Sequence, residues 1–402
     1  MGPSLLATAT ATLCAEAAVS VERGPRGVDA VVRELLSPLL HARPRPGGWR
    51  VLGWDCEQGV CVTVARGESV VMVELEALDL ARDCYARTAR FNVCARDRFG
   101  LPMDADARRA VDQLVAMIRA REAMLPLDDL RPEPTRGAMV REVEVERALM
   151  PEGRGQYYLN PYSGCMIGCP FCYVAARADF SRAIEGLPRL PWGRYVDVKV
   201  NAPAVVRREV TELPPGLVRM SPILTDPYQP LERRYRITRG CIEAMREAGF
   251  TPMVLTRAKA VVDDVDLLAS FPRAYVGFSI PTDDDAVRAR FEPGADPIDD
   301  RIEALERCHA AGLVTFAVVQ PTLPMDPARL AARLAPFVKA VRIDRMHEVE
   351  QSRPLYEAAG LTEAMTEGFF ARTVGALREA FAARGVPVDD RDDLGGLVQG
   401  AG

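Results

Sequence analysis

The chain has 402 residues, 48% of them hydrophobic, and a formal net charge of −5. This length exceeds one average domain and favours either two units or one large barrel with additions. Charges of both signs are interleaved, and arginine supplies nearly all the positive charge, because lysine occurs only at positions 199, 259 and 339. With no basic arm or patch, the composition argues against sequence-independent binding of nucleic acid.

The N-terminal stretch shows neither a positive segment nor a long apolar run. A membrane span needs about 18 consecutive apolar residues, and no part of the sequence approaches that. We therefore expect a cytoplasmic protein without a membrane partner. In a reducing compartment, ten cysteines indicate metal binding or catalysis rather than a disulfide framework.

The first region, residues 1–135, has the pattern of a small α+β domain. A helical stretch from Val28 precedes a Pro/Gly break near residue 43, and Asp104 is placed to cap a helix reaching Glu122. The expected strands are Trp49–Cys56, Val60–Val64, Val70–Leu75 and Thr88–Cys94. A proline-rich linker near residues 125–134 closes the domain, which we expect to recognise the substrate or a partner.

Residues 136–350 alternate short apolar strands with amphipathic helices such as Ile237–Ala248 and Arg301–Ala311. This alternation predicts an α/β fold with a parallel sheet, an open, partial (β/α)6 barrel. The expected strands are Gln156–Leu159, Val196–Lys199, Leu217–Thr225, Met253–Thr256, Ala274–Ser279, Thr315–Gln320 and Ala340–Ile343. Residues 351–402 form a helical C-terminal extension, with a helix over Leu361–Arg384 and a Gly/Asp-rich tail.

Three cysteines with the spacing C-x3-C-x2-C follow the first barrel strand: Cys165, Cys169 and Cys172. Thiolates are the usual ligands of iron–sulfur clusters, and this spacing suits a loop that wraps around one cluster. Gly164 and Gly168 permit the positive φ angles that such a loop needs. The motif therefore predicts a metal-binding loop.

Three protein ligands on a four-iron cluster leave one iron open, and an open position on a metal serves chemistry rather than structure. The open iron can chelate the amino and carboxylate groups of a methionine-type ligand. A structural zinc site is the alternative, but zinc ribbons carry a second Cys pair, and none follows this motif. Two-cluster ferredoxins have a fourth Cys soon after the third, which this stretch lacks.

The cysteine loop, with aromatic Phe171 before its third Cys, resembles the cluster loop of the radical SAM superfamily. The surrounding pattern is similar to the spore photoproduct lyase-like branch. The matching segments are Asn160-Pro-Tyr, Val198-Lys-Val-Asn-Ala-Pro-Ala, Thr225-Asp-Pro-Tyr-Gln-Pro-Leu-Glu232, Tyr235-Arg-Ile-Thr-Arg-Gly, Arg290-Phe-Glu-Pro-Gly-Ala and Arg301. The resemblance covers residues 155–348. It implies a [4Fe–4S] cluster, S-adenosylmethionine (SAM), and a reductase, flavodoxin or ferredoxin as electron donor.

The resemblance also implies where SAM is bound. Thr225 and Asp226 end the matching strand, where a carboxylate can face the SAM ammonium group, although Thr-Asp-Pro is also a turn-capping sequence. The family has Thr-Lys at the next strand, whereas this chain has Arg257. Arginine can bind a carboxylate in bidentate fashion but is not equivalent to lysine, so Lys259 is the alternative.

Further contacts follow from the same resemblance. Ser279 would reach the ribose or carboxylate, and Glu292 and Arg301 would steady the ribose side, with a structural ion pair or cap as the alternative role for each. Phe171 and Tyr173 are expected near the adenine. These positions complete the expected cofactor site.

The remaining cysteines give weaker indications. Cys241 and Cys308 fit the role of small core residues. Cys56, Cys61, Cys84 and Cys94 lie together in the first domain and could hold zinc or an auxiliary cluster, but their spacing matches no known pattern, and free Cys is commonly buried.

The sequence thus predicts an oxidoreductase or lyase-type enzyme that cleaves SAM to a 5′-deoxyadenosyl radical and abstracts a substrate hydrogen. A peptide, a protein side chain or a small molecule is favoured as substrate over a nucleic acid lesion or modified base. The rival hypothesis is a non-enzymatic iron–sulfur or zinc scaffold, which would not need Thr225, Asp226, Arg257 and Ser279.

Overall fold

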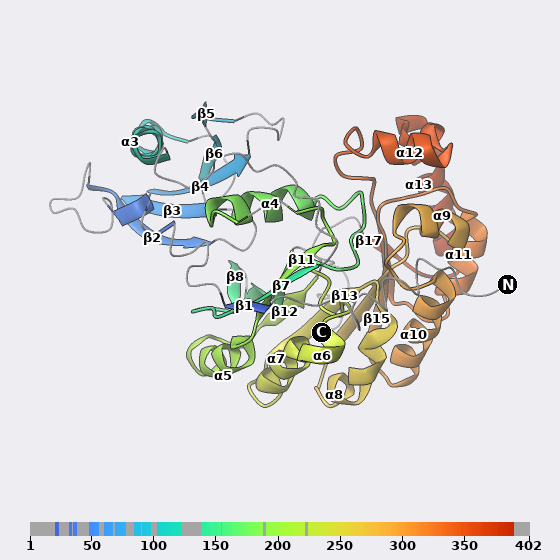
Figure 1. Ribbon diagram of the computed structural model, residues 1–402. Helices are drawn as coiled ribbons and strands as arrows, with labels where there is room; N and C mark the ends of the chain where they lie inside the picture. Colours follow the sequence, from blue (N-terminus) through green and yellow to red (C-terminus); the bar gives the residue numbers. More distant parts are fainter. Residues whose placement is uncertain are drawn as a thin grey trace. The chain divides into compact units, whose positions relative to one another are not determined.

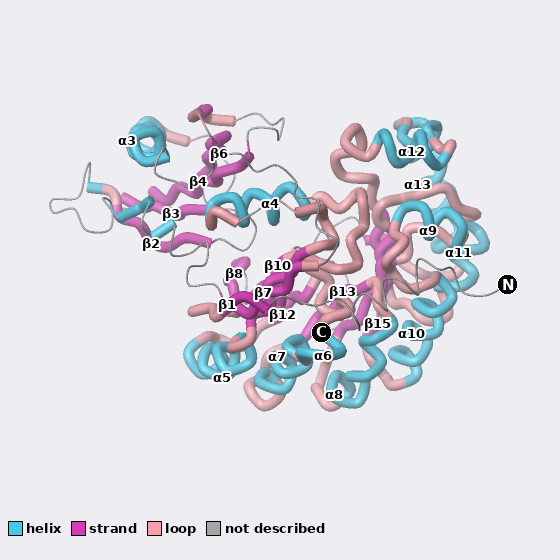
Figure 2. The backbone as a smooth tube through the Cα atoms, in the orientation of Figure 1, coloured by secondary structure: helices cyan, strands magenta, loops and turns pink. Residues whose placement is uncertain are grey.

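The computed structural model of the chain divides into two compact units (Figures 1 and 2). It describes residues 21–23, 32–33, 35–37, 48–55, 60–66, 69–77, 84–89, 91–97, 103–122, 138–153, 155–187, 190–221 and 224–389. The barrel unit comprises Met1–Val21, Gly137–Tyr173 and Trp192–Gly402; the N-terminal unit comprises Glu22–Arg136 and Val174–Pro191. No helix among the described residues is long and apolar enough to cross a membrane.

The barrel unit is built on an eight-stranded sheet in the order β17-β16-β15-β14-β13-β12-β9-β8. Its strands are β8 (Met150–Gly153), β9 (Gln156–Tyr158), β12 (Leu217–Met220), β13 (Thr251–Thr256), β14 (Tyr275–Ser279), β15 (Val314–Val319), β16 (Ala340–Ile343) and β17 (Val388–Asp389). Every neighbouring pair is parallel except the β8–β9 hairpin. The two end strands of this sheet do not pair with each other in the described structure, so the predicted α/β fold with an open, partial barrel is confirmed.

Helices follow the parallel strands and cover the outside of the sheet (Figure 1). They are α5 (Ala202–Glu212), α6 (Glu232–Tyr235), α7 (Ile237–Met245), η3 (Lys259–Asp264), α8 (Val265–Ala269), α9 (Asp285–Phe291), α10 (Ile298–Ala310), α11 (Pro327–Leu334), α12 (Arg353–Ala359), η4 (Thr362–Met365) and α13 (Glu367–Ala382). The start of α11 shows how sequence sets a boundary. Asp326 accepts hydrogen bonds from the N–H groups of Ala328 and Arg329, and Pro327 occupies the first helical position.

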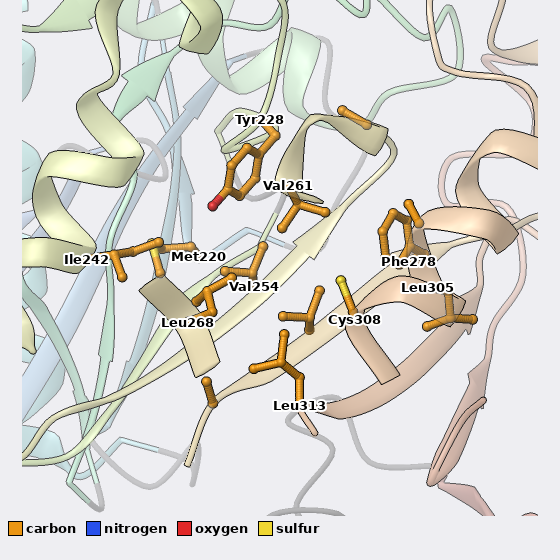
Figure 3. Packing of buried hydrophobic residues seen from close by; sticks show 14 of the residues in the cluster. Met220, Tyr228, Ile242, Val254, Val261, Leu268, Phe278, Leu305, Cys308 and Leu313 are labelled. Atoms are coloured by element: carbon orange, nitrogen blue, oxygen red, sulfur yellow. The ribbon is translucent and has the colours of Figure 1, made fainter. Parts of the chain in front are cut away.

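The core of the barrel unit lies between strands and helices (Figure 3). Val254 and Phe278 from the sheet pack in one apolar cluster with Ile242, Leu305 and Cys308 from the helices, and all five are fully buried. Parallel strands covered by helices are continuous apolar runs in the sequence, so the positions of these strands could be predicted well.

One predicted barrel strand belongs elsewhere. β11 (Tyr195–Lys199) lies in a separate four-stranded sheet, in the order β1-β7-β11-β10, with β1 (Val21–Arg23), β7 (Met139–Val143) and β10 (Tyr162–Ser163). Its parallel pairing with β7 places Asp197 opposite Arg141, and the two buried side chains form a bidentate ion pair at 2.8 and 2.5 Å. An apolar run predicts a buried strand but not its neighbour, so the expected place of Val196–Lys199 was wrong.

The N-terminal unit contains a five-stranded antiparallel sheet in the order β2-β3-β4-β6-β5. Its strands are β2 (Arg50–Asp55), β3 (Val60–Arg66), β4 (Ser69–Ala77), β5 (Ala86–Arg87) and β6 (Phe91–Asp97). Alternate side chains of β4 (Val71, Val73 and Leu75) are buried, as expected for a sheet with one apolar face. The helix predicted from Asp104 is confirmed as α3 (Ala105–Arg121), because the Asp104 carboxylate accepts from the Ala107 N–H at 2.7 Å.

Helix α4 (Val174–Ile184), which directly follows the cysteine loop, belongs to the N-terminal unit. Its Phe180 stacks edge-on against Phe91 at a centroid distance of 5.4 Å, and Phe180 and Ile184 join the apolar core of that unit. The sequence placed these residues within the 136–350 region. The structure differs because the apolar face of α4 completes the core of the antiparallel sheet.

Other expectations fall partly outside the described residues. Val32, Leu35 and Leu36, within the helix expected from Val28, are helical and buried. The break near residue 43, the hairpin loop at 57–59, the proline-rich linker, Cys14, Cys56 and the tail after residue 389 lie outside the described residues.

Gly277 in the middle of β14 provides a test of the barrel packing. A Cβ at this position would lie 2.2 Å from Cε2 of Phe316, a buried ring on the neighbouring strand. We expect Gly277→Ala to destabilise the protein by about 1–3 kcal/mol because the core is overpacked. Gly375→Ala is the matched control: nothing lies within 4 Å of its added Cβ on α13, so stability should hold or rise by up to about 1 kcal/mol. Denaturant unfolding measures both, and an undiminished stability of Gly277→Ala would contradict this packing.

Candidate functional site

The cysteine loop lies between β10 and α4. Cys165 and Cys169 are buried and Cys172 is partly exposed. Two successive turns shape the loop: the Gly168 N–H donates to the Cys165 carbonyl at 3.2 Å, and the Cys172 N–H donates to the Cys169 carbonyl at 3.0 Å. The three thiols are close enough to influence one another electrostatically. The loop therefore gathers the predicted ligands on one side of the barrel unit.

Backbone segments pack tightly around this loop where glycine removes the side chain. Gly164 and Gly168 have φ angles of +91° and +60°, as their predicted role requires. A Cβ on Gly193 would lie 2.9 Å from Cα of Gly168, and a Cβ on Gly294 would lie 2.3 Å from the carbonyl oxygen of Ile167. Gly193 and Gly294 were not predicted to serve the loop, since only spatial proximity reveals their role.

The electrostatic environment controls the cysteine protons. Burial raises the pKa of Cys165 to about 12 and that of Cys169 well above its ordinary value, while Arg257 opposes the second shift. The backbone N–H groups of Ile167 and Asp226 both hydrogen-bond to the Cys165 sulfur. The metal-free thiols of Cys165 and Cys169 are thus protonated at neutral pH, and a bound metal must displace their protons.

Asp226, immediately after β12, is a buried junction between strand ends. One carboxylate oxygen accepts from the Thr256 hydroxyl at 2.6 Å and from the Tyr228 N–H at 2.9 Å, and the other accepts from the Arg257 N–H at 2.7 Å. Its neighbour Thr225 is equally buried. Burial raises the pKa of Asp226, and these three hydrogen bonds oppose the rise. The structure thus gives Asp226 an organising role in addition to the predicted ligand contact.

The other predicted contacts form one buried polar network. Glu292 pairs with Arg257 Nε at 2.9 Å and with Arg301 Nη1 at 2.6 Å, and the Glu292 and Arg301 side chains are 0% exposed. Arg301 also donates to the Ser279 carbonyl at 2.8 Å, and the Ser279 hydroxyl donates to the Gln320 carbonyl at 3.2 Å. The network joins residues from the carboxyl ends of adjacent strands, the edge at which parallel α/β folds build their sites.

Lys259, the alternative to Arg257, lies outside this network. Its ammonium group pairs with Asp300 at 2.6 Å, and its side chain is half exposed. Arg257 instead donates to the Gln320 carbonyl at 3.3 Å, and its guanidinium carbon lies 5.9 Å from the centre of the Phe171 ring. Of the two cations, Arg257 is the one that connects the cysteine loop to the polar network.

Tyr173 differs from Phe171 in its surroundings. It is 38% exposed and packs on His347 with ring centroids 5.5 Å apart. His347 lies 3.4 Å from the Asp344 carboxylate, which also pairs with Arg342 at 2.9 Å. These three polar residues at and after the end of β16 were missed because their sequence carries no motif.

The cysteines outside the loop do not extend this site. Cys241 and Cys308 are fully buried in the barrel core, as predicted, and Figure 3 shows Cys308 there. Cys61, Cys84 and Cys94 are partly buried, and the Cys94 sulfur lies 3.6 Å from Glu76. Among the described residues, no group of three or more His, Cys, Asp and Glu side chains is preassembled at metal-binding distance, the loop cysteines included. The fit of a cluster therefore rests on the donor chemistry and fold of the loop.

Residues 159–335 match the family model of the radical SAM superfamily. Over these residues the chain belongs to that superfamily. It is an enzyme of this class, whose cofactors are a [4Fe–4S] cluster and SAM.

Three relatives illustrate the spread of this similarity. An uncharacterized protein of Methanocaldococcus jannaschii is 26% identical over 211 residues, 50% of this chain and 77% of the relative. An uncharacterized protein of Acidianus two-tailed virus is 30% identical over 175 residues, 42% of this chain and 57% of the relative. A radical SAM Nalpha-GlyT isomerase of Pseudomonas phage M6 is 30% identical over 166 residues, 41% of this chain and 33% of the relative.

Two solved structures align over larger shares of the chain. A spore photoproduct lyase variant with bound AdoMet and dinucleoside spore photoproduct aligns with 65% of this chain and 87% of its own, with 14% identity and a TM-score of 0.48. SuiB of Streptococcus suis bound to S-adenosylmethionine aligns with 72% of this chain and 57% of its own, with 11% identity and a TM-score of 0.39.

The buried ion-pair network yields a stability prediction. In Glu292→Gln the guanidinium groups of Arg257 and Arg301 lose their shared carboxylate, which should destabilise the metal-free protein by about 3–5 kcal/mol. Asp299→Asn is the control: Asp299 pairs with Arg333 but is 87% exposed, and its loss should change stability by less than about 0.5 kcal/mol. Denaturant unfolding compares the two, and equal effects would show that the buried network is not what holds the strand ends.

Proposed function

We propose that this enzyme binds a [4Fe–4S] cluster through Cys165, Cys169 and Cys172, cleaves SAM reductively and abstracts a hydrogen atom from a peptide or small-molecule substrate. The observation that carries the proposal is the direct link between the cysteine loop and the polar network. The Gln229 amide donates to the Gly164 carbonyl of the loop and to the Thr225 hydroxyl, and the Asp226 carboxylate accepts from the Arg257 N–H. A structural metal loop would not need a buried chain of charged side chains behind it.

Different residues of this chain are proposed to bind the cluster and SAM. Cys165, Cys169 and Cys172 would hold the cluster as thiolates, and a bound cluster would supply the electron for the reductive cleavage of SAM. Thr225 and Asp226 accept hydrogen bonds from the N–H groups of the SAM amino group. A carboxylate has about four lone-pair sites, and Asp226 uses three of them within the protein, so one remains for a ligand.

The rest of the network fits the carboxylate and the ribose of SAM. Arg257 offers its positive charge to the SAM carboxylate, and Ser279 and Glu292 lie toward the ribose. Nη2 of Arg301 is buried and has no hydrogen-bond partner among the described residues, so a ligand oxygen would satisfy it. The ring of Phe171 and the partly exposed ring of Tyr173 supply apolar surface for the adenine.

The N-terminal unit is proposed to recognise the substrate or a partner. The mild acidic balance disfavours a polyanionic substrate and favours a peptide or small molecule. The low-potential electron would come from a reductase, flavodoxin or ferredoxin in the cytoplasm. Helix α4, which is part of the N-terminal unit, continues the chain directly from the cysteine loop, because it begins one residue after Tyr173.

Anaerobic reconstitution with iron and sulfide tests the enzyme class. With dithionite and SAM, the wild-type protein should release 5′-deoxyadenosine, and Cys172→Ala should reduce the yield to background because one cluster ligand is lost. Cys308→Ala, which alters a buried core cysteine, should keep its iron and its activity. A colourless protein that binds zinc instead of iron would support the rival scaffold function.

Asp226→Asn tests the SAM contact separately from the cluster. The change keeps the size of the side chain but removes the negative charge proposed to face the SAM amino group. We expect the Kd for SAM to rise roughly 10- to 100-fold, the value of one charge-assisted hydrogen bond, with the iron content unchanged. Calorimetry or spectroscopic titration of the iron-loaded protein measures the change. An unaltered Kd for SAM would show that Asp226 does not bind the SAM amino group.

A further inference from the structure

Gln229 is a fully buried side chain in the turn that follows β12. Its Oε1 accepts from the Met166 N–H at 2.9 Å, and its Nε2 donates to the Gly164 carbonyl at 3.2 Å. Gly164 and Met166 are the two residues that flank Cys165. One amide group therefore hydrogen-bonds to the backbone on both sides of Cys165, the first proposed cluster ligand.

The same turn makes further contacts with this ligand. The Gly164 N–H donates to the Leu224 carbonyl at 3.2 Å, and the Asp226 N–H bonds to the Cys165 sulfur. Gln229 Nε2 also donates to the Thr225 hydroxyl at 2.9 Å. The turn from Leu224 to Gln229 thus holds the backbone and sulfur of Cys165 and a proposed SAM contact in one hydrogen-bonded group.

The geometry points to Gln229 as a positioning residue that fixes Cys165 and sets the hydrogen bonding to its sulfur. This inference rests on the proposed binding of a cluster by the three loop cysteines. Gln229 touches neither cluster nor substrate in this role and acts through Cys165 and Thr225. Gln229 carries no separate signal in the sequence, where it is one residue of a segment that matches the family.

The expected consequences follow from general properties of iron–sulfur sites. N–H groups directed at cluster sulfur atoms stabilise the more negative, reduced cluster and so raise the reduction potential. Without Gln229 the Cys165 backbone is free to shift relative to the Asp226 N–H, which weakens this hydrogen bond. Loss of Gln229 should therefore make the potential more negative and the cluster easier to remove.

The test uses Gln229→Met, which keeps side-chain volume but removes both hydrogen-bonding groups, and Gln229→Glu, which keeps the acceptor for the Met166 N–H. Asn201→Leu is the matched control. The Asn201 amide likewise hydrogen-bonds to the backbone. It accepts from the Val145 N–H and donates to the Val145 carbonyl, both at 2.9 Å. Iron content, the rate of cluster loss to a chelator, the cluster potential and the Kd for SAM are measured on each full-length protein.

We expect Gln229→Met to lose its cluster roughly tenfold faster than the control, a factor worth about 1.4 kcal/mol. Its potential should be more negative and its affinity for SAM lower, with Gln229→Glu intermediate. Gln229→Met matching Asn201→Leu in potential and in cluster loss would overturn the inference while leaving the proposed function intact. A wild-type protein that takes up no iron would overturn both.

Discussion

The site depends on a single buried carboxylate, Glu292, placed between two guanidinium groups. Arg257 and Arg301 come from different parts of the barrel unit, and each would be costly to bury without an opposite charge. The two ion pairs of Glu292 connect Arg257 at the end of β13 with Arg301 at the start of α10. Arg301 also hydrogen-bonds to the Ser279 carbonyl at the end of β14. The strand ends are thereby held in a fixed arrangement before any ligand binds, which is the condition for an electrostatically preorganised site.

The cysteine loop is attached to this framework by backbone contacts. Gly164, Gly168 and Gly294 allow the loop to approach neighbouring segments more closely than any side chain would permit. Asp226 then connects the two halves, since its N–H bonds to the Cys165 sulfur and its carboxylate to the Arg257 N–H. Cluster ligand and proposed SAM contacts are therefore parts of one hydrogen-bonded structure.

Much of the fold could be predicted because the barrel strands are continuous apolar runs between amphipathic helices. The pattern failed at Val196–Lys199, whose pairing with β7 brings together Arg141 and Asp197, two residues 56 positions apart. It also failed at α4, whose apolar face completes a different core. Choice of neighbour is a tertiary property, and local periodicity does not contain it.

The candidate site shows the same division. The cysteine loop could be singled out because ligand chemistry demands one residue type at a fixed spacing, and its role as a cluster site stays a prediction. Glu292 and Arg301 were expected to lie near one cofactor, but their mutual contact and their link to Arg257 come from the fold. Gln229 and Gly193 carry no chemical signature in the sequence, because glutamine and glycine serve here through backbone contacts with distant residues.

The central claim is that three thiolates leave one iron open for the amino and carboxylate groups of SAM. Electron–nuclear double resonance on the reduced cluster, with SAM carrying nitrogen-15 in its amino group, tests this claim most directly. The account predicts a nitrogen-15 hyperfine coupling to the cluster that is absent when unlabelled SAM is used. A cluster that forms in full but shows no such coupling and no spectral change with SAM would contradict it.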